Sequence, residues 1–155
     1  MTSTDTAIPA QLTVVAWPDP IVEALGFPPD HPYSELVWTS TLGPSAVLAW
    51  RQLARTLVAN PDGFSLDVAD LGHSLGLGGT GAHAPVRRTL RRLAVFGMAS
   101  FVDEATYAVR RCIPPLSSSQ LRRLGPQLNR LHGALLKRHD DDRLARRARA
   151  LRKGA

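Results

Sequence analysis

The sequence predicts a mainly α-helical protein with one small β-hairpin, an α+β class, flanked by an N-terminal arm and a C-terminal helical extension. Apolar residues recur at helical spacing in three segments between residues 44 and 97. Two short segments rich in β-formers flank the turn-like stretch 103–106 and predict the hairpin. Seven of the 12 prolines lie in the first 44 residues, which argues against long regular elements there.

Length and composition bound the class of protein. A chain of 155 residues has room for one domain with a core plus extensions, and its 44% hydrophobic content is ordinary for a globular protein. Cys112 is the single cysteine, so neither an intrachain disulfide nor a cysteine zinc cluster is possible. We find no apolar run of bilayer length and no secretory signal. We therefore expect a cytoplasmic protein, associated with the nucleoid when bound, and no membrane partner.

Charge is distributed unevenly along the chain. Residues 1–70 hold eight acidic and two basic side chains, a net charge of −6, whereas residues 71–155 have a net charge of +12. Such asymmetry is typical of a polyanion-binding surface or of a basic tail. Arginine outnumbers lysine 17 to two, a bias that a GC-rich genome alone produces, so the placement of the arginines is better evidence than their number.

The N-terminal arm, residues 1–43, is expected to pack on the domain rather than to float free. Large aromatic side chains favour burial, and the arm has four of them: Trp17, Phe27, Tyr33 and Trp38. A short helix is expected at 21–25.

Two helices are expected next. The first runs over 44–59, with Pro44 suited to the first helical position and residues 60–63 (N-P-D-G) as a stop. The second runs over 67–75, with Ser65 or Asp67 as its cap and Gly76 at its end.

The segment 84–97 predicts a third helix with a sharply divided surface. Val86, Leu90, Leu93 and Phe96 lie on one side, and the arginines occupy the arc from about 100° to 240° around the helix axis. A face of this kind is either a solvated surface or a contact for a polyanion. Four arginines lie on it: Arg87, Arg88, Arg91 and Arg92.

A glycine-rich turn precedes this helix. Residues 76–81 match the pattern G-x-G-x-x-G, but a helical segment rather than a strand precedes them, so we do not interpret them as a dinucleotide site. Backbone amides here could instead approach a DNA phosphate at the helix start. Thr80 and His83, from this turn, join the expected DNA-binding set.

After Gly97, residues 98–102 and 107–113 predict the two strands of the hairpin. A Ser-x-x-Gln capping box at 117–120 then opens the Leu-rich extension, residues 116–138. Gly125 and Pro126 interrupt this extension, which predicts either one kinked helix or two short ones. Its leucines follow spacings of 3, 4, 3 and 4, an a/d seam that either packs back on the domain or pairs two chains, and we favour the homodimer: Leu121, Leu124, Leu128, Leu131 and Leu135.

The last segment, residues 139–155, is a basic tail. Six basic residues and no acids follow the run of aspartates at 140–142. We expect a non-specific DNA-binding extension, with a frayed solvated helix as the alternative.

Three helices with a turn before the third, followed by a β-hairpin, resemble the winged helix-turn-helix domain of bacterial transcription regulators. The resemblance covers residues 44–115, including the Leu-x-x-Phe-Gly-Met run at the junction between helix and hairpin, and the whole chain also resembles uncharacterised small actinobacterial proteins. The family places its third helix in the major groove. By position this implies that Arg87, Arg88, Arg91 and Arg92 lie at the groove. We expect Arg88 and Arg92, deepest in the polar arc, at guanine edges, and phosphate contacts from Arg87, Arg110 and Arg111.

The resemblance implies double-stranded DNA as the partner and a homodimeric transcription regulator as the function. The alternative is a winged-helix interaction module that docks an acidic protein in a transcription, replication or plasmid-maintenance complex. The acidic tip of the hairpin, Asp103 and Glu104, favours that alternative because it would repel phosphates.

No pattern in the sequence predicts an enzyme. It contains no nucleophile elbow, P-loop or zinc motif, and the five histidines show no metal spacing. Cys112 is interpreted as a small core residue, although neighbouring arginines could lower the pKa of its thiol. We expect no catalytic residues, no metal and no cofactor.

Overall fold

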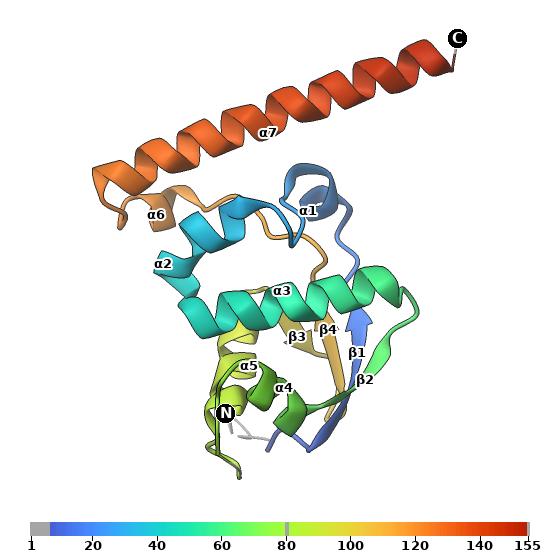
Figure 1. Ribbon diagram of the computed structural model, residues 1–155, viewed down its shortest axis with the longest axis vertical. Helices are drawn as coiled ribbons and strands as arrows, with labels where there is room; N and C mark the ends of the chain where they lie inside the picture. Colours follow the sequence, from blue (N-terminus) through green and yellow to red (C-terminus); the bar gives the residue numbers. More distant parts are fainter. Residues whose placement is uncertain (1–6, 80, 155) are drawn as a thin grey trace. The chain divides into compact units, whose positions relative to one another are not determined.

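The computed structural model describes residues 7–79 and 81–154. It is a mixed protein of helices and a four-stranded sheet, which confirms the α+β class at that level (Figure 1). The chain divides into two compact units, residues 1–114 and residues 115–155.

The first unit holds the sheet and the helices that cover it. Its elements are β1 (Gln11–Ala16), α1 (Pro20–Leu25), the π-helix η1 (Ser34–Trp38), α2 (Thr39–Leu42), α3 (Pro44–Ala59), β2 (Phe64–Asp67), α4 (Val68–Ser74), α5 (Pro85–Val95), β3 (Ala99–Phe101) and β4 (Thr106–Val109).

The sheet has the order β2-β1-β4-β3. β1 is antiparallel to β2 and parallel to β4, and β3 and β4 form the expected hairpin. In the register, Val14 lies opposite Phe64 on one side and Tyr107 on the other. The strand nearest the N-terminus thus joins the hairpin to β2 (Figure 1).

Strands β1 and β2 correct the sequence interpretation, which expected no strand in the first 43 residues or between the first two helices. The signal for β1 is a short alternation: Leu12 and Val14 are buried, whereas Gln11 and Thr13 are exposed. No proline interrupts this stretch, because it lies between Pro9 and Pro18. β1 forms because its two edges pair with strands that lie about 50 and 90 residues further along the chain.

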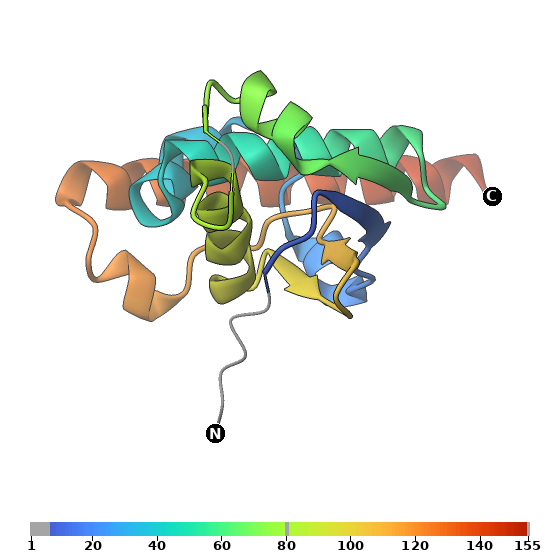
Figure 2. The same cartoon turned by 90° about the horizontal axis from the view of Figure 1, so that it is seen from below.

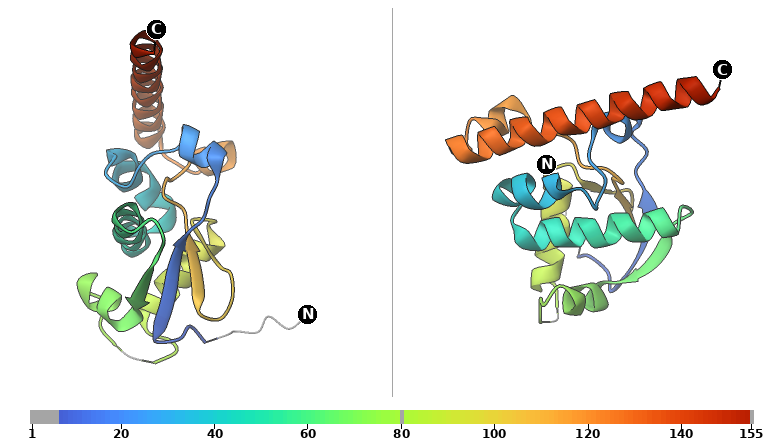
Figure 3. Two further views of the ribbon diagram at one scale, coloured as in Figure 1. Left: turned by 90° about the vertical axis from the view of Figure 1, so that its right-hand side faces the viewer. Right: turned by 45° about the horizontal axis from the view of Figure 1, so that its top comes forward.

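The three helices expected between residues 44 and 97 are confirmed as α3, α4 and α5. α3 has Pro44 in its first turn and buries the stripe of Val47, Trp50, Leu53 and Leu57. α4 begins after Asp67, whose carboxylate accepts the amide of Asp70, 3.0 Å away. α3 packs across β1 and β4 on one face of the sheet, and α5 crosses α3 at a steep angle (Figures 2 and 3).

Aromatic side chains from residues 17–38 lie against the rest of the unit. Phe27 stacks on Tyr33 with ring centroids 3.9 Å apart, and its backbone exchanges two hydrogen bonds with Ile113. The Trp38 indole donates to the carbonyl of Pro114 over 2.7 Å, and all three rings are buried. These contacts connect the segment before α3 to the end of the hairpin.

The second unit contains α6 (Ser118–Leu121) and α7 (Pro126–Lys153). The capping box at Ser117 and Gln120 is confirmed. Of the two expected alternatives, one kinked helix or two short ones, the structure has two separate helices, of which only α6 is short. The Asn129 side chain donates to carbonyls of both helix ends, at Leu121 and Gly125, over 3.2 Å. α7 continues through the aspartates and the basic segment as one helix of 28 residues, about 42 Å long.

Candidate nucleic-acid interface

α5 is held rigidly by contacts on both its sides and its end. Val86, Leu90 and Leu93 are buried, and the buried Tyr107 hydroxyl of β4 donates to the carbonyl of Leu90 over 2.8 Å. Gly97 ends the helix with φ +72°, where the amide of Met98 reaches back to Leu93. This left-handed cap turns the chain directly into the hairpin. The rotation of α5 about its axis is therefore set, and with it the direction of each arginine.

The outward line of α5 consists of Arg88, Arg91 and Val95. Arg88 is exposed, and no hydrogen bond or ion pair involves it among the described residues. Val95 is 81% exposed, although it is apolar. Arg91 is half-buried and makes contacts of its own. Because α5 carries no acidic residue, the charge along this line is not neutralised within the helix.

Arg87 and Arg92 flank that line and donate hydrogen bonds to backbone carbonyls of other segments. Arg87 donates from Nε to the carbonyl of Ile8 and from Nη1 to that of Gly81, over 2.9 and 3.0 Å. Arg92 donates from Nε and Nη2 to the last carbonyls of α2, at Leu42 and Thr41. A cation at a helix C-terminus satisfies carbonyls that have no partner within the helix. Sequence reasoning grouped all four arginines together because it could not locate these carbonyls.

Arg110 and Arg111 also have internal partners. Arg110 pairs with Asp19, the N-cap of α1, donates to the carbonyl of Gly97 over 2.7 Å and lies over the Trp17 ring. Its side chain is only 16% exposed. Arg111 pairs with Glu23 over 2.6 Å. The hydrogen bond from Arg110 holds the pKa of Asp19 below its usual range, with help from the amide of Val22. Their geometry assigns both arginines to the attachment of α1, so we leave them out of the interface.

The turn before α5 is open to solvent. Gly79 and Gly81 have φ values of +98° and +95°, which only glycine adopts readily, and His83 is exposed. Thr80 lies outside the described residues. The segment that precedes the G-x-G-x-x-G match is α4, a helix, which confirms the reason for setting aside a dinucleotide site.

The tip of the hairpin is acidic and exposed. Asp103 and Glu104 both face solvent, and the Asp103 carboxylate accepts the amide of Ala105 over 2.9 Å. That bond is the main cause of the lowered pKa of Asp103. The tip is therefore negatively charged at neutral pH. The hairpin tip is therefore a poor candidate for contact with phosphate.

Cys112 has no sign of activation. Its thiol is half-buried, and burial raises its pKa, supported by the charge of Glu23; Arg111 opposes these effects but does not outweigh them. The suggestion that arginines lower the pKa of this thiol is wrong, because burial and the charge of Glu23 together outweigh Arg111. Within residues 7–79 and 81–154 no group of three metal-binding side chains occurs, and no helix there is long and apolar enough to cross a membrane.

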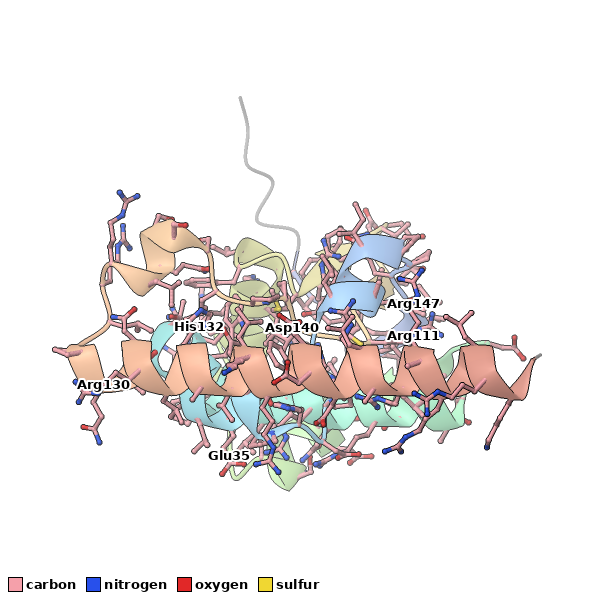
Figure 4. All side chains as sticks on the ribbon, turned by 90° about the horizontal axis from the view of Figure 1, so that it is seen from above. Glu35, Arg111, Arg130, His132, Asp140 and Arg147 are labelled. Carbon is pink, nitrogen blue, oxygen red and sulfur yellow. The ribbon has the colours of Figure 1, made fainter. Side chains whose placement is uncertain are left out.

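The second unit presents basic side chains along α7. Arg130 and Arg147 lie toward opposite ends of this helix (Figure 4). Arg143 pairs with Asp140 over 3.2 Å, whereas the arginines and the lysine after it are exposed. The exposed helical form agrees with the expected solvated helix more closely than with an irregular tail. The five leucines of the predicted seam, from Leu121 to Leu135, are each half-buried.

No family model, no curated protein and no solved structure matches this chain. Its function therefore has to be argued from the geometry of its own residues.

Proposed function

We propose that the first unit is a winged helix domain that binds double-stranded DNA through the outward line of α5. The order of a long helix, two shorter helices and a hairpin supports this proposal, with α5 in the position of the helix that enters the major groove. β1 is a strand that this order does not require, and it lies between β2 and the hairpin.

The observation that carries the proposal is the charge of Arg88, which is exposed and takes part in no hydrogen bond or ion pair among the described residues. Arg91 and Val95 follow it on the same outward face of α5, and no carboxylate lies on that helix. Guanidinium groups take phosphates or the O6 and N7 atoms of guanine, and an exposed valine suits a thymine methyl group. Arg87 and Arg92 would then set the angle of the helix instead of reading bases.

The test is duplex DNA binding by fluorescence anisotropy at several salt concentrations, between about 50 and 200 mM. Arg88→Gln should weaken binding and lower the slope of log K against log salt by about one. Arg123→Gln removes one charge from an exposed arginine of the second unit and is the matched control. If wild-type protein forms no complex with random or genomic duplexes at the lowest salt, the proposal is wrong.

A homodimeric regulator is the further part of the proposal. Pairing of two chains through the half-buried leucines would set two α5 helices on successive major-groove faces, about 34 Å apart. Sedimentation equilibrium of wild type and Leu131→Glu distinguishes the alternatives. A monomeric wild type at high concentration would favour packing within the chain and would leave DNA binding by single units untouched.

The second candidate function is docking of an acidic protein on the same face of α5. The acidic hairpin tip favours it, because Asp103 and Glu104 would oppose a nearby phosphate backbone. Asp103→Asn with Glu104→Gln tests whether the hairpin tip lies near the bound partner: it should strengthen binding of any polyanion that the tip approaches and leave binding unchanged if only α5 is in contact. Binding of an acidic peptide but of no duplex by the wild type would favour this second function.

A further inference from the structure

A hollow lies between α5 and the corner where α2 ends and α3 begins. Its volume is about 340 Å³, and residues 42–46, Leu77 and one face of α5 line it. Sites that hold small ligands or chemical groups in proteins have volumes of roughly 300–1,000 Å³. The hollow is therefore large enough for one compact group. α5 passes directly beside the start of α3 (Figure 2).

Two arginines line this hollow, and no acidic residue does. Arg88 and Arg92 reach it from successive turns of α5. Arg92 is held in place by its bonds to the carbonyls of Thr41 and Leu42, 3.0 and 2.5 Å away. Arg88 takes part in no hydrogen bond or ion pair in the described part of the chain. Two like charges at one hollow raise the free energy of the empty site, and an anion between them lowers it.

The neutral groups around the hollow add donors rather than acceptors. α3 begins after Gly43 without a side-chain cap, and Pro44 contributes no N–H. The amides of Ser45 and Ala46 therefore have no partner within the helix, and the Ser45 hydroxyl lies beside them. The Thr89 hydroxyl donates to the carbonyl of Pro85 and is already satisfied. The site offers charge and several donors to a ligand that can only accept.

We propose that this hollow binds a single phosphate group, with Arg88 and Arg92 as the charged contacts. Phosphate has the oxygen atoms and the negative charge that paired guanidinium groups recognise. The group comes either from the DNA backbone or from a free phosphate. In the first case the inference rests on the proposed DNA binding and names one phosphate that fixes the register of α5. In the second case the free anion competes with DNA for Arg88.

Amide NMR spectra of the full-length chain test the proposal. One titration uses inorganic phosphate against sodium chloride at matched ionic strength, and the other uses a duplex without terminal phosphates. The amides of Ser45 and Ala46 report on the hollow, and those of Arg91 and Val95 report on the outward line of α5. We expect phosphate to shift the first pair only and the duplex to shift both pairs.

Ser45→Asp gives a variant that folds and blocks the site. A carboxylate in the first turn of α3 stabilises the helix through its dipole, so the melting temperature should not fall. The same charge should weaken phosphate binding at the hollow about tenfold or more. Ser45→Asn has the same shape without the charge, and it should bind phosphate like the wild type.

The outcomes separate the two proposals. If neither phosphate nor duplex shifts Ser45 and Ala46 beyond the chloride control, the phosphate site is refuted. If the duplex shifts Arg91 and Val95 alone, DNA binding stands and the DNA backbone is refuted as the source of the phosphate; the site then stands for a free anion only if inorganic phosphate shifts Ser45 and Ala46, and is refuted if it does not. If phosphate shifts the hollow and no duplex binds, the site is supported for a free anion and the proposed DNA function fails. Equal shifts in wild type and Ser45→Asp would also overturn the site.

Discussion

The contribution of β1 to the stability of the first unit can be measured with a single substitution in its buried face. Leu12 is 1% exposed and faces the core on a strand that pairs with β2 on one edge and β4 on the other. Shortening Leu12 to alanine removes three carbon atoms from a site that cannot refill from solvent. The neighbouring Val14 is fully buried on the same face, so little rearrangement is available.

We expect Leu12→Ala to lower the free energy of unfolding by about 2–5 kcal/mol. A domain of this size has a total stability of about 5–15 kcal/mol, so the loss is a large share of it. By the same reasoning a fragment of residues 44–115, the boundary suggested by the family resemblance, should not fold alone. It would lack the strand between β2 and β4 and would expose the apolar face that Leu12 and Val14 cover.

Urea unfolding followed by tryptophan fluorescence and circular dichroism measures the effect. Thr13→Ala is the matched control, because Thr13 lies on the same strand and faces solvent. Its change should stay within about 0.5 kcal/mol. A Leu12→Ala variant as stable as Thr13→Ala, or a cooperatively folded 44–115 fragment, would refute the conclusion that β1 is part of the core.

Three further predictions concern side chains that the fold engages. Tyr107→Phe removes the buried hydrogen bond to Leu90 and should cost about 0.5–1.5 kcal/mol in the same urea assay, with no loss of helix content. Gly97→Ala places a side chain at φ +72° and should cost about 1–2 kcal/mol; an unchanged stability would argue against the left-handed cap. The pKa of Asp19 is lowered from 3.8 mainly by Arg110, so the stability it contributes is present above that value and is lost as pH falls through its lower folded pKa. Asp19→Asn should flatten the drop in melting temperature below about pH 4, and a wild-type profile without that drop would contradict the ion pair.

Local signals in the sequence predicted the helices well. Pro44 and the stop after Ala59 bound α3, Asp67 caps α4, and Gly97 ends α5, each by an interaction within a few residues. The Ser117 capping box was predictable for the same reason. Each of these signals depends on chemistry between chain neighbours, which the order of residues determines directly.

The candidate interface was predictable only in part. The amphipathic pattern of α5 correctly placed its arginines away from the core. It could not distinguish Arg88, which has no hydrogen bond or ion pair among the described residues, from Arg92, which caps a helix about 50 residues earlier in the chain. Nor could it pair Arg110 with Asp19, 91 residues away, because both partners look like ordinary surface charges in sequence.

By itself the sequence determined α3, α4 and α5 with their ends, the capping box before α6, the hairpin and the charged face of α5, but not η1 and α2. The tertiary structure decided that an N-terminal strand joins the sheet between β2 and β4, that Arg87, Arg92, Arg110 and Arg111 bind within the unit, and that two arginines line a hollow beside α3. The physical reason is range. Helix propensity and capping act over a few residues, whereas strand pairing and guanidinium contacts depend on which distant backbone groups the fold brings within hydrogen-bonding distance.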